Sequence, residues 1–321
     1  MSRYKLLQEI PLEMVRMVPS RYSFEFYDPI ARKGEEEKYG TIGILLPPLL
    51  LQEQDEYEIL QGKLYVDHCR LKGHSLPYGL LLAKKNDDFE LLRFLVHFKK
   101  ETGGFNTVEK AIVVSRFYEF TGSVPEELLI LLDIPKNEKY VKGYMQLSKA
   151  PDVVKLTVLH GDLHENTAFE IFRFSEECWP MLTEFISRLF LGTKKRNEIL
   201  DMLRAVSDGD RESVARILKS DELTQILESG TDPPQIASRI YDIIKEKRYP
   251  EMSRYRKKFY RKLKEVGFHR NIHITLPKDF EQWDFVMSIK FSSVEELRTK
   301  LVELKEISES ESFFELMKLR Y

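Results

Sequence analysis

The sequence predicts a multidomain α+β protein: a small mixed α/β N-terminal domain, an all-helical middle with a helix-turn-helix, and a small α/β C-terminal domain. Three observations predict this fold class. The 321 residues are enough for two or three domains. Strand and helix patterns mix over the first hundred residues, and a helical period takes over from Asp87. Alternating segments return only near the C-terminus. We therefore expect domains at residues 1–103, 104–232 and 233–321.

The N-terminal region shows strand signals interrupted by one short helix. Extended segments are expected at residues 10–15, 48–52, 57–60 and 76–83. The second and third are separated by a short polar turn, which favours a hairpin. Residues 65–72 predict a helix that Gly73 ends. Leu91, Leu92, Leu95 and Phe98 then recur at three- and four-residue spacing, which predicts the first long helix.

The middle region is a series of short helices, of which residues 107–120, 193–205, 212–219 and 234–247 are the clearest. One pair resembles a helix-turn-helix: a helix at residues 125–132, a turn at residues 133–135, and a second helix at residues 136–147. We expect Val141, Met145 and Leu147 to pack inward. Pro135 in the turn and Gly143 in the second helix are atypical for this motif.

Polar residues gather on the first half of that second helix, the part that a DNA-reading helix presents to base edges and phosphates. The expected DNA contacts are Lys136, Asn137, Lys139, Tyr140 and Lys142. The alternative is an ordinary helical hairpin whose lysines are solvated.

The C-terminal region is expected to fold as helix, strand, strand and helix. Residues 252–266 predict a helix ended by Gly267, and residues 269–275 and 285–291 alternate like strands. Ser293 with Glu296 three residues later forms a capping box for a helix at residues 294–307.

A basic segment at residues 245–264 holds ten Lys and Arg residues against two Glu residues. It is a second candidate for contact with the DNA backbone, and such contacts would make binding steeply salt-dependent. The expected contact residues are Arg254, Lys257, Lys258 and Arg261. The alternative is a solvated helix face with Phe259 and Leu263 packed on the terminal strands.

Composition sets limits on these interpretations. Fifty Lys and Arg residues against 52 Asp and Glu residues exclude a chain that is basic throughout. Residues 101–244 are acidic as a whole, with 17 basic and 24 acidic residues, although they contain the expected reading helix. The two cysteines, Cys69 and Cys178, are too few for a disulfide framework or a structural zinc site, so we expect a cytoplasmic protein with a buried Cys69. The longest apolar run, residues 42–51, is too short to span a membrane.

An ordered series of motifs resembles the ParB family of chromosome-partitioning proteins, whose N-terminal domain has the ParB/sulfiredoxin fold. The series covers about residues 10–175 and contains Ile10-Pro11-Leu12, Pro19-Ser20-Arg21-Tyr22, residues 43–51, Tyr57 to Gly62, Asn106 to Ala111, and residues 126–147 with Tyr140-Val141. It continues through Ala150-Pro151 and residues 161–168.

The resemblance implies binding of double-stranded DNA by a nucleoid-associated homodimer, with a ParA-type ATPase as a further partner. It also places His164 near the N-cap of a helix, in reach of the DNA backbone. Chromosome or plasmid partitioning and transcriptional regulation both stay open as the cellular process.

The chain departs from the family at the nucleotide motif. Where the family carries Gly-Glu-Arg-Arg, the sequence reads Gly62-Lys63-Leu64-Tyr65, and His97-Phe98 stands where the family has Glu-Asn. Leucine cannot replace an arginine fork on phosphate, and phenylalanine offers magnesium no oxygen. Gly62, Lys63 and Arg70 are what remains of a phosphate site, so we expect CTP binding with magnesium to be weakened or absent and no CTPase or nuclease activity. One alternative is a CTP-dependent DNA clamp with an altered pocket; another is a protein-interaction scaffold without DNA binding.

Overall fold

The computed structural model describes residues 4–16, 20–28, 46–82, 87–268, 271–275 and 285–319. Pro19, residues 43–45 of the glycine-to-proline motif, residue 83 of the predicted strand at 76–83, and residues 269–270 of the predicted strand at 269–275 lie outside these ranges. The chain forms two compact units, Met1–Ala237 and Ser238–Tyr321, and the boundary along the chain falls within the helix Pro233–Arg248. The boundary expected after residue 103 stays a prediction.

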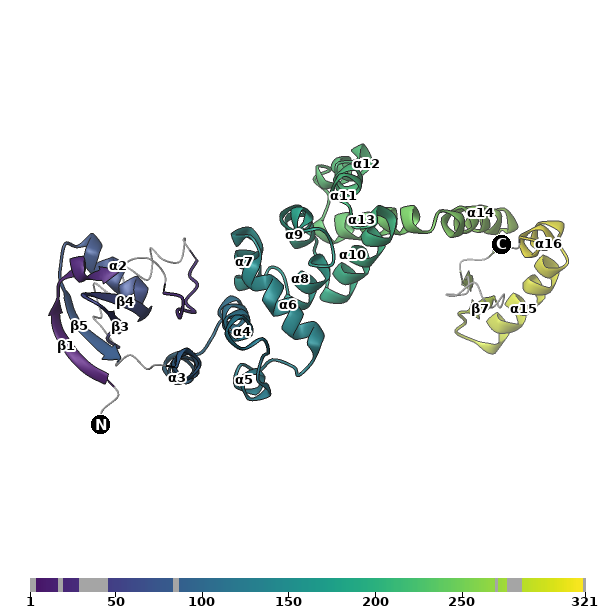
Figure 1. Cartoon of the computed structure of the whole chain (residues 1–321). Coiled ribbons are helices and arrows are strands. Elements are labelled where there is room, and N and C mark those ends of the chain that lie inside the picture. Colours follow the sequence, from purple (N-terminus) through teal and green to yellow (C-terminus); the bar gives the residue numbers. More distant parts are fainter. Residues whose placement is uncertain are drawn as a thin grey trace. The chain divides into compact units, whose positions relative to one another are not determined.

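The first unit begins with a mixed five-stranded sheet in the order β1-β5-β3-β4-β2 (Figure 1). β1 pairs antiparallel with β5, β3 lies parallel to β5 and antiparallel to β4, and β2 lies parallel to β4. The strands are β1 (Tyr4–Ile10), β2 (Val15–Arg16), β3 (Leu49–Glu53), β4 (Glu56–Gln61) and β5 (Leu76–Leu82), with a 3-10 turn, η1, at Leu12–Met14. The predicted hairpin is confirmed as β3 and β4, joined through Gln54, which has a positive φ of 56°.

The sheet packs on α2 (Lys63–Leu71), and the core between them contains Leu50, Ile59, Val66 and Cys69. Cys69 is buried as expected, and burial raises the pKa of its thiol. β1 was missed from the sequence because Tyr-Lys-Leu-Leu-Gln-Glu-Ile does not alternate cleanly. Its partner, β5, lies about seventy residues away along the chain, so no local signal marks the pairing.

From Asp88 to Leu227 the first unit consists of helices and short connections (Figure 1). Its helices are α3 (Asp88–Thr102), α4 (Thr107–Thr121), α5 (Glu126–Leu131), α6 (Glu138–Lys149), α7 (Asp152–Leu159), α8 (Glu165–Ile171), η2 (Glu176–Cys178), α9 (Trp179–Ser187), α10 (Thr193–Ser207), α11 (Arg211–Leu218) and α12 (Asp221–Leu227). α13 (Pro233–Arg248) leads into the second unit. α4 is a central element, because α3, α6 and α7 all pack against it.

The segment at residues 20–28 ties the sheet to these helices. Tyr22 is buried and donates its hydroxyl to Asp88 at the start of α3 (2.6 Å). The Phe26 N–H donates to the carboxylate of Glu109 at the start of α4 (3.4 Å). Glu109 also forms a capping box with Asn106 and an ion pair of 2.8 Å with Lys99. Lys99 and Glu109 are nearly buried, so they must stay paired for the fold to tolerate them.

The second unit has α14 (Pro250–Val266), a hairpin of β6 (Ile272–Thr275) and β7 (Val286–Ile289), α15 (Val294–Ser308) and α16 (Glu311–Met317). Its core gathers Tyr255 and Phe259 with Ile274, Leu316 and Leu319. Ser293 caps α15 as predicted by accepting the Glu296 N–H, while the Glu296 carboxylate accepts the N–H of Ser292. α16 is an addition to the predicted helix-strand-strand-helix order.

Candidate nucleic-acid interface

α5 and α6 lie where the sequence predicts the helix-turn-helix, and the turn between them is firmly anchored. Ile134 is buried and donates its N–H to the Leu129 carbonyl (2.8 Å). Asp133 takes a left-handed conformation with φ 55°, and its carboxylate accepts from Lys100 of α3 (3.1 Å). The second helix starts at Glu138 rather than at residue 136, because Asn137 is its N-cap and accepts the Lys139 N–H.

The inner face of α6 is defined by a close approach to α8. A Cβ at Gly143 would lie 2.5 Å from the Phe169 ring, so a glycine is required there. Tyr144 and Leu147 complete the buried face, and Tyr144 packs edge-on against Phe169. Gly143, which is atypical for the motif in the sequence, is therefore a packing requirement. Val141 and Met145, expected to pack inward, are only half-buried.

The start of α6 presents four of the five predicted DNA-contact residues to solvent. Lys136, Asn137, Lys139 and Lys142 are exposed, and Tyr140 is half-buried with its ring edge-on against Phe169. The structure thus brings the five predicted α6 contacts together along one helix start.

Each of the three lysines nevertheless has an acidic partner. Lys136 pairs with Glu126 of α5 (2.8 Å), Lys139 with Glu170 of α8 (2.8 Å) and Lys142 with Glu138 of α6 (2.6 Å). The pairs of Lys136 and Lys142 are exposed on both sides and such pairs contribute little to stability, so phosphate oxygens can replace these carboxylates at small cost. Glu170 is mostly buried, and if Lys139 turns to DNA its carboxylate keeps Arg173 as a partner (2.7 Å). The acidic partners still reduce the positive charge that the helix offers to DNA.

The pKa values of these acids reflect the pairing. Hydrogen bonds from Lys136 and Lys142 lower the pKa of Glu126 and of Glu138, respectively. Burial works against ionisation of Glu170, but the hydrogen bonds from Lys139 and Arg173 outweigh it and its pKa is lowered. All three acids are therefore ionised at neutral pH.

His164 is the N-cap of α8, where the resemblance places it. Its Nδ1 accepts the Asn166 N–H (3.2 Å), so Nε2 carries the proton in the neutral ring. The neighbouring Glu165 accepts the Tyr144 hydroxyl (2.6 Å), and burial together with this bond raises the pKa of Tyr144. His164 is thus placed on α8, the helix that supports α6.

The start of α2 is where the remnant nucleotide motif lies. Gly62 has φ 90°, and a Cβ there would approach the Cα of Pro48 to 3.0 Å. The backbone N–H groups of Gly62 and Lys63 both donate to the carboxylate of Glu25, at 2.8 and 3.2 Å. A carboxylate of the chain itself thus holds the helix N-terminus, the position at which backbone amides favour an anion.

Arg70 does not join Gly62 and Lys63. It lies in the last turn of α2 and donates to the Leu12 carbonyl (3.3 Å). It lies seven positions after Lys63 on the same helix, which is about 10 Å along the axis. The structure therefore splits the three predicted phosphate contacts between the two ends of α2.

α14 divides cleanly into two faces. Tyr255 and Phe259 are buried, and the Phe259 ring stacks on Phe285 at 5.6 Å. The predicted contact residues on the other face are all exposed: Arg254, Lys257, Lys258 and Arg261. Arg254 pairs with Glu251 (2.7 Å) and Lys257 with Glu246 (2.5 Å). The expected packing of Phe259 is confirmed, and the basic face is available to solvent.

Over the described ranges, no three or more His, Cys, Asp or Glu side chains are grouped so that they could hold a metal ion. Among the helices that the structure describes, none is both long and apolar enough to cross a membrane.

Comparison with known proteins gives structural relatives only, since no family model and no curated protein matches the chain. The chain is similar to ParB structures. ParB from Caulobacter crescentus, C-terminally truncated and complexed to the centromeric parS site, is 18% identical, with 62% of this chain and 99% of that chain covered and a TM-score of 0.34. The same truncated protein complexed with CTP-gamma-S is 17% identical over 57% and 97% of the two chains, with a TM-score of 0.25. A pNOB8-like ParB N-domain is 14% identical over 74% and 96%, with a TM-score of 0.33.

The acids that pair with the start of α2 and with the lysines of α6 were not predicted from the sequence, apart from neighbours on one helix. Glu25 lies 37 residues before Gly62, and Glu170 lies 31 residues after Lys139. Neither pairing leaves a local signal, because both depend on how distant segments pack. Glu138 was open to prediction, since it lies four residues before Lys142 on one helix.

Proposed function

We propose that this chain is a ParB-like DNA-binding protein that reads duplex DNA with α6. The observation that carries the proposal is the two-sided character of this helix. Gly143, Tyr144 and Leu147 are buried, so this side of α6 is held against the protein. The solvent side presents exposed lysines and an asparagine at the helix start. Helices that enter the major groove use this part for base and phosphate contacts.

The basic face of α14 is proposed to supply phosphate contacts. Arg254, Lys257, Lys258 and Arg261 lie at three- and four-residue spacing on the exposed side of a single helix. Phosphate contacts carry no sequence information but dominate affinity. His164 is proposed as a further backbone contact from α8.

Fluorescence anisotropy with duplex DNA over a salt series tests the assignment of α6. We expect the triple variant Lys136→Ala/Lys139→Ala/Lys142→Ala to bind at least roughly tenfold more weakly than wild type, since three charge-assisted contacts are lost. The matched control removes three other exposed lysines of the first unit, in Lys72→Ala/Lys194→Ala/Lys219→Ala. Equal DNA affinities for the two triple variants would show that these lysines of α6 do not contact DNA.

We further propose that the nucleotide pocket is degenerate. The Glu25 carboxylate already accepts the two N–H groups that a phosphate would need, and it would repel a second anion. Calorimetry with CTP and magnesium, with and without DNA, should show no binding to wild type. Tight CTP binding by wild type would instead favour the CTP-dependent clamp. Binding only by Glu25→Ala would show that this carboxylate is what excludes the nucleotide.

A two-fold dimer is proposed through the second unit. Apolar side chains are exposed on β7 and α15, among them Val286, Leu301 and Val302. A two-stranded sheet is marginal alone, and a second copy of the same surface would cover it. Light scattering should give a dimer for wild type and a monomer for Leu301→Glu/Val302→Glu; a wild-type monomer would contradict the proposal. A ParA-type ATPase partner and a nucleoid location stay predictions from the resemblance.

A further inference from the structure

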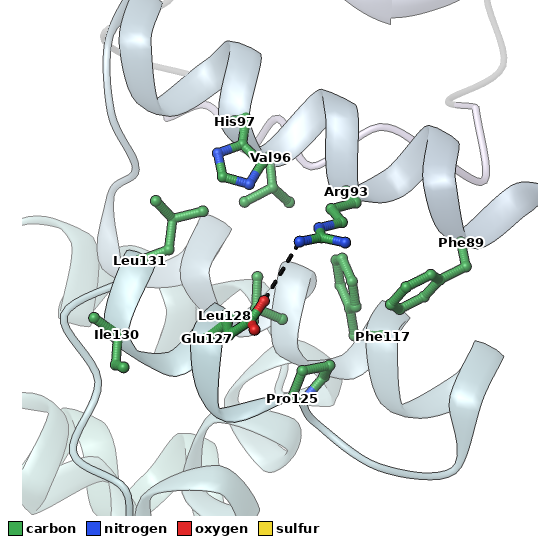
Figure 2. Close-up of a pocket in the computed structure, with 10 residues that line it drawn as sticks. All are labelled: Phe89, Arg93, Val96, His97, Phe117, Pro125, Glu127, Leu128, Ile130 and Leu131. Atoms are coloured by element: carbon green, nitrogen blue, oxygen red, sulfur yellow. Dashed lines mark hydrogen bonds and ion pairs between the residues drawn. The ribbon is translucent and has the colours of Figure 1, made fainter.

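A cavity of about 250 Å³ lies between α3, α4 and α5 (Figure 2). None of the proposed DNA contacts lines it, nor do Gly62, Lys63 and Arg70; of the nucleotide-motif positions only His97 does. Its apolar wall is formed by side chains from all three helices: Phe89, Val96, Phe117, Leu128 and Leu131. Ile130 stands at its edge and is 59% exposed, so the cavity has an open side.

The polar groups of the cavity are few and lie together. Arg93 of α3 extends over the apolar wall toward Glu127 of α5, and His97 lies one turn further along α3 (Figure 2). The Arg93 guanidinium pairs with Glu127 at 3.4 Å and with Glu90 at 3.9 Å. An apolar pocket with a few convergent polar groups is the usual form of a small-molecule site.

We propose that this cavity binds a small amphiphilic carboxylate, with its apolar tail against Phe117 and Leu128 and its carboxylate on Arg93. The tail would remove apolar surface from water, which is the main source of affinity in such sites. The guanidinium supplies a planar fork of donors that matches a carboxylate.

Glu127, the present partner of Arg93, can readily be replaced by the carboxylate of a ligand. The Glu127 side chain is 84% exposed, and the pair distance of 3.4 Å is long for a charge-assisted hydrogen bond. Exposed ion pairs of this kind contribute little. A ligand carboxylate held in place by its tail would therefore replace Glu127 on Arg93, and a cationic ligand would meet the guanidinium instead.

The volume sets the size of the ligand. At about 30 Å³ for a water-sized group, the cavity holds about eight such groups. Octanoate is the matching probe, since its eight carbons fill this volume while its carboxylate oxygens lie on the half-exposed Arg93. Octanol and octylamine keep the tail and change the head group. The site and its test require no DNA, so they stand apart from the proposed function.

Methyl NMR of the full chain during octanoate titration tests the proposal. We expect saturable shifts of the Val96, Leu128, Ile130 and Leu131 methyl groups, and roughly tenfold weaker binding of octanol and octylammonium. Shifts that do not saturate, or that miss these methyl groups, would overturn the site. Equal affinity for octanoate and octanol would overturn the role of Arg93.

Two variants move the affinity in opposite directions. Arg93→Gln removes the carboxylate partner and should weaken octanoate binding roughly tenfold. Glu127→Gln removes the internal competitor and should strengthen it. The matched controls are Arg188→Gln and Glu184→Gln, which break an exposed ion pair on α9 and should leave affinity unchanged. The proposal is overturned if Arg93→Gln binds octanoate like wild type, or if the methyl shifts depend on protein concentration without octanoate, which would indicate a second copy in the cavity.

Discussion

α6 and α14 are both amphipathic helices with basic solvent faces, yet they differ in what surrounds their charges. The three lysines at the start of α6 are matched by Glu126, Glu138 and Glu170. α14 has seven Lys and Arg residues against two Glu residues within its own length. α6 thus has the geometry of a DNA-reading helix, but acids offset its positive charge. α14 has excess positive charge but is not part of a helix-turn-helix. Affinity and specificity are therefore expected to reside on different helices.

The largest effect should follow loss of charge on α14. The quadruple variant Arg254→Gln/Lys257→Gln/Lys258→Gln/Arg261→Gln removes up to four phosphate contacts. The slope of log affinity against log salt should fall by up to about 3.6, at about 0.9 for each contact. Affinity should drop by orders of magnitude at low salt for every DNA sequence. An unchanged salt slope in anisotropy titrations would show that α14 does not touch phosphates.

Packing beneath α6 gives the next effect. Gly143→Ala places a Cβ against the buried Phe169 ring and should destabilise the first unit by about 1–3 kcal/mol in urea unfolding. The matched control is Gly192→Ala, where a Cβ meets nothing within 4 Å and φ is −67°. Stability of Gly143→Ala equal to wild type would mean that α6 is not held against α8 as described.

A smaller effect should follow removal of the acids around α6. Glu126→Gln/Glu138→Gln/Glu170→Gln frees all three lysines and should raise DNA affinity severalfold. The corresponding change removes the two acids that pair with α14, Glu246 of α13 and Glu251 of α14, in Glu246→Gln/Glu251→Gln. It should raise affinity less, because α14 already has excess positive charge. Anisotropy at fixed salt measures both. A larger gain from the α14 pair would contradict the charge contrast between the two helices.

The smallest effect is a difference in acid titration between the units. The pKa of Glu170 is lowered from 4.5, and that of Glu296 is lowered to about 2 by hydrogen bonds from Lys300 and Ser292. A lowered pKa means that the stabilisation is present above the ordinary value and is lost as pH falls through the folded value. Carboxyl NMR should therefore show a Glu170 midpoint below 4.5, and Glu296 staying ionised until about pH 2. A Glu296 midpoint near 4.5 would contradict the hydrogen bonding described for this residue.

Local features of the fold could be predicted from the sequence. Ser293 caps α15, Gly267 ends α14 with φ 74°, and the β3–β4 hairpin forms around its polar turn. Each depends on residues within a few positions of one another. The mixed α+β class and the helical middle were predicted for the same reason.

Long-range features could not be predicted. β1 depends on β5 for its pairing, and the Glu25 carboxylate reaches α2 only because residues 20–28 pack across the sheet and α3. Four of the five predicted DNA-contact residues are exposed at the start of α6, while Tyr140 packs on Phe169. The acidic partners of the three lysines come from α5 and α8 as well as from α6. Lysine spacing alone therefore overstates the positive charge of α6.

The most direct test of the separation between affinity and specificity is a DNA selection followed by binding measurements on the selected and a scrambled duplex. The α14 quadruple variant should lose affinity for both duplexes and keep the specificity ratio, the affinity for the selected duplex divided by that for the scrambled one. The α6 triple variant, Lys136→Ala/Lys139→Ala/Lys142→Ala, should lose mainly the ratio. Loss of the ratio in the α14 variant, with the ratio kept in the α6 variant, would contradict the account.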